Sequence, residues 1–435
     1  MKLSAIATAF LVGYAAAVPM VTPPTFSDGM MAPLFASNEA EALSDSYIVV
    51  MKPDVSERRI EEHTNWINAL AVDANDNSNG LFSNWLLHRD TIGIKHVYNM
   101  PQLKGYSGKF GKEVLDIIRR SDDVAYVEKD SMVYTSELQR NAPWALSFGT
   151  FNKYQYAEEP GKDIKVYVID TGVNIEHVDL EGRAIWGNTV PVGDEDEDGN
   201  GHGSHCAGTI AGAKYGVAKK AHPVAVKVLR SNGSGTMSDV VKGVEWATER
   251  HIQEAQQAKK TGAKYKGAVA NMSLGGGKSP TLDRFVNAAV EAGIVFAVAA
   301  GNDNQDACNY SPAASELAIT VGASTLNDDR AYFSNYGECV DVFAPGLNIQ
   351  SIWRGSKYAT NTISGTSMAS PHVAGLAAYF LSQAEEGVTP KQIKDKIIEL
   401  ATEGALSGIP KDTPNKLIYN DFAPKLRNLR FSEYM

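Results

Sequence analysis

The chain has 435 residues, of which 43% are hydrophobic and 21% charged. This is the balance of a globular protein, and the length predicts two folded units with additional segments rather than one average domain. The net charge of −10 argues against a nucleic-acid partner, because phosphate binding requires a basic surface.

The N-terminal segment has the pattern of a secretory signal peptide. A lysine at position 2 precedes an apolar stretch over residues 3–12 and three alanines at 15–17. These are the charged, hydrophobic and small-residue parts of such a leader, so we expect residues 1–17 to be removed. No later apolar run has the roughly 20 residues needed to span a bilayer. The sequence therefore predicts entry into the secretory pathway without a membrane span.

The next stretch predicts a linker followed by a small α+β domain. Residues 18–46 are rich in Pro, Ser, Ala and Met without periodicity, which is typical of a linker. Strand and helix patterns then alternate up to about Tyr134. They are strands at 47–51, 93–97, 106–110 and 124–127, a helix capped by Ser56, an Asn/Asp loop at 74–80 and a helix at 111–120. Strand–helix–strand–strand–helix–strand is the order of a ferredoxin-like domain.

After residues 141–144 the strands become continuous apolar runs, with helical stretches between several of them. The runs lie at 166–169, 224–229, 268–274, 295–300 and 318–321, and the helices at 238–259, 282–292 and 368–381. Buried runs alternating with helices indicate an α/β fold with a mostly parallel sheet flanked by helices. Residues 421–435 are polar and unpatterned, which predicts a C-terminal tail.

Three reactive residues lie at element boundaries in this second unit. Asp170 comes directly after the run at 166–169, and the carboxyl ends of parallel strands are where reactive groups gather. His202 stands between two glycines before a helix of small residues. Ser367 lies at the start of the helix at 368–381, where free N–H groups and the helix dipole favour negative charge. Taken singly, each also fits a structural role, as a turn cap, a core histidine and an N-cap.

Together these residues fit nucleophilic catalysis. A serine hydroxyl is a weak nucleophile at neutral pH and needs an adjacent base, which in turn needs a group that orients it. Ser367, His202 and Asp170 supply this set. Asn302 follows another buried run, and its amide could stabilise an oxyanion together with the Ser367 backbone N–H. Loss of one such donor typically costs about 3 kcal/mol of barrier.

Two features leave alternatives open. His202 and His205 lie three residues apart, which is also a spacing of metal ligands, although no carboxylate lies at ligand spacing on the same element. The acidic run at 194–198 fits either a solvated loop or a rim that attracts cations.

The chain has three cysteines. In an oxidising compartment, one disulfide and one free thiol is the simplest arrangement. Cys308 and Cys339 are the favoured pair because both lie in loop-like sequence, and Cys206 is expected to be free. A zinc site is not indicated, because no C-x-x-C motif occurs.

Four blocks of this chain resemble the signature sequences of the subtilisin-like serine proteases, in that family's order of Asp, His and Ser. The blocks are residues 170–172, 202–205, 300–302 and 365–369. The resemblance spans about residues 141–420 and implies a subtilisin-like α/β fold. Residues 141–144 and 309–312, with the cysteine after the His block, are similar to the proteinase K branch and within it to the cerevisin group.

The resemblance implies a binding cleft for an extended peptide between two Gly-rich edges. The residues of these edges are Gly233, Ser234 and Gly235 on one side and Ser273, Leu274 and Gly275 on the other. A peptide that adds as a strand is read through its main chain more than its side chains, so broad specificity is expected.

The small first domain resembles the inhibitory I9 prosegment of these proteases, over about residues 46–135. The resemblance implies a zymogen whose prosegment assists folding and then blocks the cleft. Aligning residues 141–144 with the family's mature start predicts self-cleavage at Ser136–Glu137. The expected divisions are a signal peptide at 1–17, linker and prosegment at 18–136, a catalytic domain at 137–420 and a tail at 421–435.

The implied chemistry needs no cofactor, but members of the family often hold structural calcium. One such site matches Asp341 with the backbone carbonyls near Glu316 and Ala318. Calcium at this place is therefore an expectation from the resemblance, and it rests on one acidic side chain.

Other residues carry expectations about modification. A thiol at Cys206, beside the His block, predicts sensitivity to mercurials. Glycosylation sequons begin at Asn232 and Asn309, and a third begins at Asn271, which lies in a predicted buried strand and should be unmodified.

The sequence thus predicts a monomeric serine endopeptidase zymogen of the secretory pathway, destined for a vacuole or the exterior. Its partners would be peptide and protein substrates and its own prosegment. A catalytically dead homologue that binds peptides is the alternative, and the complete set of four site residues argues against it. A lipase of the α/β-hydrolase type is rejected, because the G-x-S-x-G motif and the order Ser, Asp, His do not occur.

Overall fold

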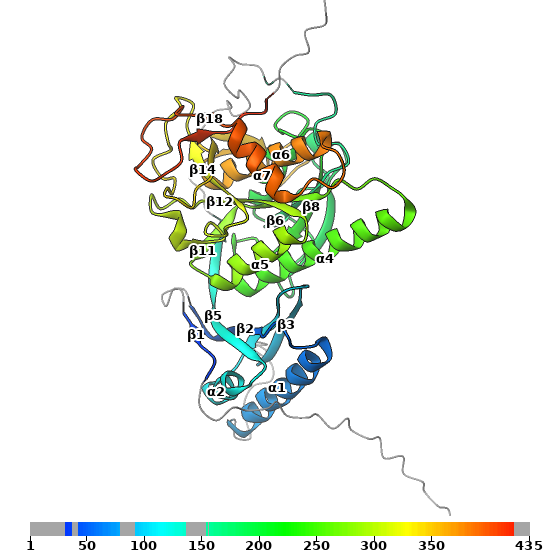
Figure 1. Cartoon of the computed structure of the whole chain (residues 1–435), viewed down its shortest axis with the longest axis vertical. Coiled ribbons are helices and arrows are strands. Elements are labelled where there is room, and N and C mark those ends of the chain that lie inside the picture. The colour runs from blue at the N-terminus through cyan, green and yellow to red at the C-terminus, as the bar shows by residue number, and fades with distance from the viewer. Residues whose placement is uncertain (1–30, 37–41, 79–91, 136–153, 155, 422–435) are drawn as a thin grey trace, which may run out of the picture.

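The computed structural model describes residues 31–36, 42–78, 92–135, 154 and 156–421, which form a smaller N-terminal and a larger C-terminal domain (Figure 1). The predicted signal peptide, residues 136–137 and residues 141–144 lie outside the described residues, as does the tail beyond residue 421. None of the helices in the described part of the chain is long and apolar enough to cross a membrane.

The N-terminal domain has the predicted strand order. Its elements are β1 (Leu34–Phe35), β2 (Ala42–Met51), α1 (Glu57–Ser78), β3 (Gly93–Asn99), β4 (Lys104–Lys109), α2 (Lys112–Arg120) and β5 (Val124–Thr135). The antiparallel order β5-β2-β4-β3 is that of a ferredoxin-like domain. The linker prediction is wrong at its C-terminal part, where β1 pairs with β5 and β2 begins. The loop predicted at 74–80 is also wrong up to residue 78, because α1 continues to Ser78.

A nine-stranded sheet forms the centre of the C-terminal domain, in the order β18-β19-β15-β14-β12-β10-β6-β8-β7. All neighbours are parallel except β18 and β19. The strands are β6 (Lys165–Asp170), β7 (Ile185–Thr189), β8 (His222–Lys227), β10 (Ala268–Met272), β12 (Ile294–Ala299), β14 (Ile319–Ser324), β15 (Val342–Pro345), β18 (Thr402–Glu403) and β19 (Lys416–Leu417).

Helices cover both faces of this sheet. They are α3 (His202–Ala211), α6 (Thr366–Gln383) and α7 (Pro390–Leu400) on one face and α4 (Met237–Thr261) and α5 (Pro280–Glu291) on the other. Successive residues of β6 alternate between the two cores: Val168 packs with the first group and Ile169 with the second. A strand buried on both faces reads as one apolar run, which is the pattern that the sequence predicted.

The last strand of the N-terminal domain reaches into the C-terminal domain. β5 pairs with β2 and then continues between the short strands β9 (Ser234–Thr236) and β11 (Leu274–Gly277). Figure 1 shows β5 running from the lower domain up to β11. One strand therefore belongs to both units.

Candidate active site

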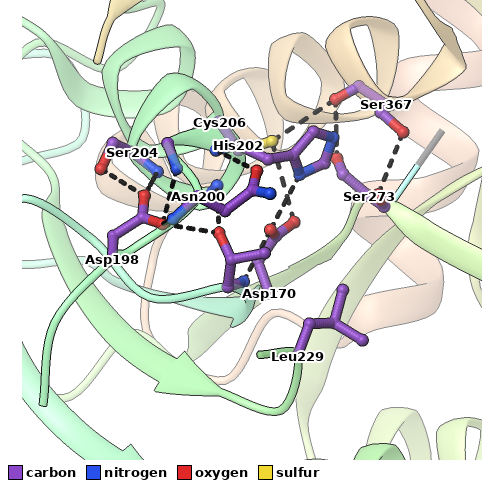
Figure 2. Close-up of polar contacts among 12 residues, drawn as sticks. Asp170, Asp198, Asn200, His202, Ser204, Cys206, Leu229, Ser273 and Ser367 are labelled. Atoms are coloured by element: carbon purple, nitrogen blue, oxygen red, sulfur yellow. Dashed lines mark hydrogen bonds and ion pairs between the residues drawn. The ribbon is translucent and has the colours of Figure 1, made fainter. Parts of the chain in front are cut away.

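The site begins with an aspartate and a histidine that are hydrogen-bonded to each other at the carboxyl end of the central strand β6. Asp170 is the last residue of β6, and His202 is the first of α3. His202 Nδ1 lies 2.8 Å from Asp170 Oδ1, and both side chains are fully buried (Figure 2). Gly203 permits this approach: a Cβ there would press on the Gly172 carbonyl and lie 3.1 Å from the Asp170 Cβ.

Ser367 lies in the first turn of α6, as the sequence predicted. Its hydroxyl donates to the Ser273 carbonyl at 3.0 Å, and the Ser273 hydroxyl donates to the Ser367 carbonyl at 2.7 Å. In the view of Figure 2, the His202 imidazole lies between Asp170 and Ser367. The three residues that the sequence singled out therefore come from three elements to one place.

Asn302 is oriented by the residue before Ser367. Its side-chain oxygen accepts hydrogen bonds from the Thr366 N–H at 2.8 Å and the Thr366 hydroxyl at 2.9 Å. The Thr366 hydroxyl is also 3.1 Å from the N–H of Gly301. Because these bonds hold the amide oxygen of Asn302 in place, the NH2 group of the same amide points in a defined direction away from Thr366.

Asp198 links the Asp170 loop to the start of α3, and sequence reasoning missed it. One oxygen accepts from the Thr171 hydroxyl and the Gly201 N–H, both at 2.8 Å, and from the Asn200 N–H at 3.1 Å. The other accepts from the Ser204 hydroxyl at 2.6 Å and its N–H at 2.9 Å. An aspartate just before a glycine-rich helix start is a capping signal that could have revealed this role.

The contacts of this region bear on the two alternatives that the sequence left open. Asp198 ends the acidic run and is buried in these hydrogen bonds, so the choice between a solvated loop and a cation rim concerns the exposed residues 195–197. His205 donates its N–H to the Ile349 carbonyl at 2.9 Å, and burial lowers its pKa to about 3. In the described residues, the ligand atoms that gather within 4.8 Å of one another are those of Asp170, His202 and Cys206. His205 is therefore not a member of the group of possible ligands that contains His202 in the described residues.

A strand already occupies the cleft beside Ser367. Tyr134 pairs with Ser234 on one side and with Gly275 on the other, and Thr135 lies opposite Leu274. The Thr135 N–H donates to the Gly233 carbonyl at 3.0 Å. Next to this strand is a cavity of about 320 Å³, which is lined by Tyr134, Leu274 and Ser367 and by residues 275–277 and 299–301. Both predicted edges therefore flank the C-terminal end of β5.

Two carboxylates on β5 bind the N-termini of the helices that support the cleft. Asp130 accepts from the N–H of Ser238 at 3.1 Å and from its hydroxyl at 2.7 Å, in the first turn of α4. Glu128 accepts from the N–H of Thr281 at 3.0 Å and from its hydroxyl, in the first turn of α5. Burial raises the pKa of the Asp130 carboxyl, against the bonds from Ser238 that lower it. A carboxylate is stabilised by free N–H groups at a helix start, so these contacts anchor the N-terminal domain.

The cysteines are arranged as expected. Cys308 and Cys339 form a disulfide with a Cα–Cα distance of 5.4 Å, and Cys206 is buried and lies outside this disulfide. The Cys206 sulfur lies 3.5 Å from the Ser367 carbonyl oxygen. Asn271 is fully buried with its amide bonded to Ser273, which agrees with its expected lack of modification.

The expected calcium site does not fit the residues present. The Lys394 ammonium lies 3.0 Å from the Glu316 carbonyl, 2.6 Å from the Ala318 carbonyl and 3.0 Å from Asp341 Oδ2. The positively charged Lys394 ammonium thus occupies the place at which these three oxygens converge. The expectation of calcium at Asp341 is corrected on this ground, because a second cation at the same place would be repelled.

Comparison with known proteins places the chain in a family. A model of the subtilase family matches residues 161–416. The chain belongs to the subtilase family. A model of the peptidase inhibitor I9 domain matches residues 46–136 of this subtilase, which is the domain that contains β5.

Known proteins are similar in sequence to most of this chain. It is 58% identical over 414 residues to subtilisin-like serine protease Pen c 2 of Penicillium citrinum, covering 89% of this chain and 90% of that protein. Alkaline protease 2 of Aspergillus fumigatus is 56% identical over 415 residues, covering 89% and 83%. The crystal structure of a cold adapted subtilisin-like serine proteinase matches with a TM-score of 0.57 and 44% identity, covering 66% of this chain and 96% of that one.

These findings confirm the predicted class and fold. This subtilase is a serine protease that is made with an inhibitory I9 prosegment. Catalysis in the subtilase family requires no cofactor.

Proposed function

We propose that Ser367 is the nucleophile of this protease, that His202 is its general base and that Asp170 orients the imidazole. The contact that carries the proposal is the 2.8 Å hydrogen bond between Asp170 and His202, both buried. It fixes the tautomer with a proton on Nδ1, which leaves Nε2 as the base, and it stabilises the imidazolium that forms. The Ser367 hydroxyl turns from the Ser273 carbonyl to donate to Nε2 before it attacks.

Asn302 is the proposed side-chain donor of the oxyanion hole. Attack by Ser367 on a peptide carbonyl places negative charge on the carbonyl oxygen. The Asn302 NH2 group, held by Thr366, and the backbone N–H of Ser367 would stabilise that charge. His202 then gives its proton to the leaving amine, and the acyl-enzyme is hydrolysed by a water that His202 activates.

The proposed substrate-binding residues are the six that flank β5. They are Gly233, Ser234, Gly235, Ser273, Leu274 and Gly275. The end of β5 serves as a guide to how an extended peptide would lie, since its Tyr134 pairs with both edges. Recognition through backbone hydrogen bonds supports broad specificity.

The register of β5 supports self-cleavage at Ser136–Glu137. Thr135, the residue before the proposed bond, lies opposite Leu274. The carbonyl of Ser273, the neighbour of Leu274, accepts the Ser367 hydroxyl at 3.0 Å, so the described end of β5 lies close to the proposed nucleophile. The proposed divisions are a signal peptide at 1–17, linker and prosegment at 18–136, a catalytic domain at 137–420 and a tail at 421–435. We propose a monomeric enzyme of a vacuole or the exterior.

The intact mass of the purified full chain over time tests this proposal. The native chain should split near Glu137, and Ser367→Ala should stay whole. Ser364→Ala is the control, because Ser364 is a buried serine on the same segment and its loss should leave splitting intact. If Ser367→Ala splits like the native chain, another protease performs the processing. If neither splits and a serine-directed phosphonate does not label Ser367, the protein is a peptide-binding homologue without activity.

A further inference from the structure

Lys394 is the centre of a cluster of oxygens that lies outside the active site. Its side chain comes from α7 and is 17% exposed. Two backbone carbonyls, of Glu316 and Ala318, and the carboxylate of Asp341 lie within 2.6–3.0 Å of the ammonium nitrogen. A lysine ammonium has three N–H donors, so each finds an acceptor in this cluster.

The donor set itself is of a kind that binds a hard cation. Ca²⁺ is held in proteins by carboxylate and backbone carbonyl oxygens at 2.3–2.6 Å, with water completing the shell. Ala318 is fully buried, and the Asp341 side chain is 20% exposed. Carbonyl oxygens that converge here without a positive partner would be poorly compensated away from water.

We propose that the Lys394 ammonium is the resident cation of this cluster and makes the protein's stability at this place independent of divalent metal. The ammonium neutralises Asp341 and satisfies both carbonyls through one covalently attached group. Ca²⁺ would have to enter within about 3 Å of an existing positive charge, which opposes its binding. Replacement of the lysine by a small neutral residue would open the cluster to the metal.

The cluster holds together two strands of the central sheet. Asp341 Oδ2, which binds Lys394, also accepts from the Thr320 N–H at 2.8 Å, and the Asp341 N–H donates to the Thr320 carbonyl at 2.9 Å. Thr320 belongs to β14, and Asp341 directly precedes β15. The Cys308–Cys339 disulfide fixes the chain two residues earlier. Loss of the cation should therefore loosen the start of both strands and lower the thermal unfolding midpoint.

Thermal unfolding of the full chain in CaCl2 and in EDTA tests the proposal, in a Ser367→Ala background that prevents self-digestion. Lys394→Ala should lower the midpoint in EDTA by about 2–4 °C. Millimolar CaCl2 should recover a large part of that loss, and a further Asp341→Asn change should abolish the recovery. Lys391→Ala is the control, because Lys391 lies one turn earlier on α7 with a side chain that is 79% exposed. It should change neither midpoint.

Three results would overturn the proposal. A parent midpoint that rises with CaCl2 and loses this rise on Asp341→Asn would mean that the cluster already binds metal beside the lysine. A lower midpoint for Lys394→Ala without a calcium response would reduce Lys394 to an ordinary ion pair. An unchanged midpoint would show that the cluster needs no cation. If Lys394→Ala does not fold, Lys394→Met, which keeps the packing of the stem, takes its place, and the comparison of the parent with Asp341→Asn is unaffected.

Discussion

The two domains bury their sheets in different ways. The central sheet of the catalytic domain is covered on both faces by its own helices. The prosegment sheet is covered by its own helices on one face, where Val49 packs with residues of α1 and α2. Its other face, with Ile48 and Tyr98, joins the core formed by α4 and α5 of the catalytic domain.

This difference means that catalysis and inhibition by the prosegment depend on different contacts. The proposed catalytic residues lie on a sheet whose two faces are covered by helices of the same domain, whereas one face of the prosegment sheet is covered only by the catalytic domain. Apolar side chains stabilise a sheet only when they are buried. A small domain buries little surface by itself, so the prosegment depends on the catalytic domain to bury its second face. We therefore expect changes in the catalytic framework to alter turnover without changing inhibition, and changes at the prosegment interface to do the reverse.

Asn302→Ala should have the largest effect and should be confined to catalysis. We expect kcat to fall about 10²–10³-fold with little change in KM, the magnitude known for the oxyanion-hole asparagine of a subtilisin. Steady-state kinetics on a peptide substrate measure this. Labelling of Ser367 by a phosphonate should persist, and an equal rise of KM would show that Asn302 acts in substrate binding instead.

The double change Glu128→Gln and Asp130→Asn should weaken inhibition by the prosegment about 10–100-fold, because each neutral amide binds a helix N-terminus less well than a carboxylate. Inhibition of the mature enzyme by added prosegment measures this. Lys129→Gln, between the two, is the matched control. An inhibition constant equal to that of the native prosegment would contradict the anchoring role of these carboxylates.

Asp198→Asn should reduce kcat about 10-fold, because the amide replaces one acceptor oxygen by a donor that faces N–H and hydroxyl donors. Asp198 acts through the position of His202, so the acidic limb of the pH–rate profile should shift as well. Glu195→Gln, exposed in the same run, should leave both unchanged. A lower yield of folded protein with native kcat and pH profile would assign Asp198 to stability alone.

The smallest effect concerns pH and stability. Burial lowers the pKa of His372 to about 4, from 6.5. Between pH 4 and 6.5 the unfolded chain therefore binds more protons here than the folded one, so the contribution is complete above pH 6.5 and is lost as the pH falls towards 4. The slope is at most about 1.4 kcal/mol per pH unit.

His372→Asn should flatten the pH dependence of the free energy of unfolding in this range, since the asparagine NH2 can replace the N–H that donates to Met368. Urea unfolding of Ser367→Ala protein between pH 5 and 7 measures the slope. His222→Asn is the comparison, because this half-buried histidine loses less water and should change the slope less. An unchanged slope for His372→Asn would contradict a neutral buried imidazole.

Local patterns in the sequence determined the layers and the reactive residues. Continuous apolar runs predicted strands buried on both faces, and Asp170 at the end of one such run was placed at the edge of the sheet. Ser367 was placed at a helix start by the apolar stretch after it. These predictions succeed because periodicity and capping act within one element, and because the carboxyl ends of parallel strands share an edge.

The tertiary structure alone decided which polar groups converge. Asp198 became a link between two loops and Lys394 the centre of an oxygen cluster only because α3 and α7 pack where they do. The family resemblance implied calcium at the place that the Lys394 ammonium occupies, because the resemblance could not show that a side chain of the remote helix α7 reaches this place. The length of β5 likewise depends on its pairing with β9 and β11. The burial of the second face of the prosegment sheet depends on its packing against α4 and α5. Convergence depends on the energies of contacts between elements, which no pattern within one element contains.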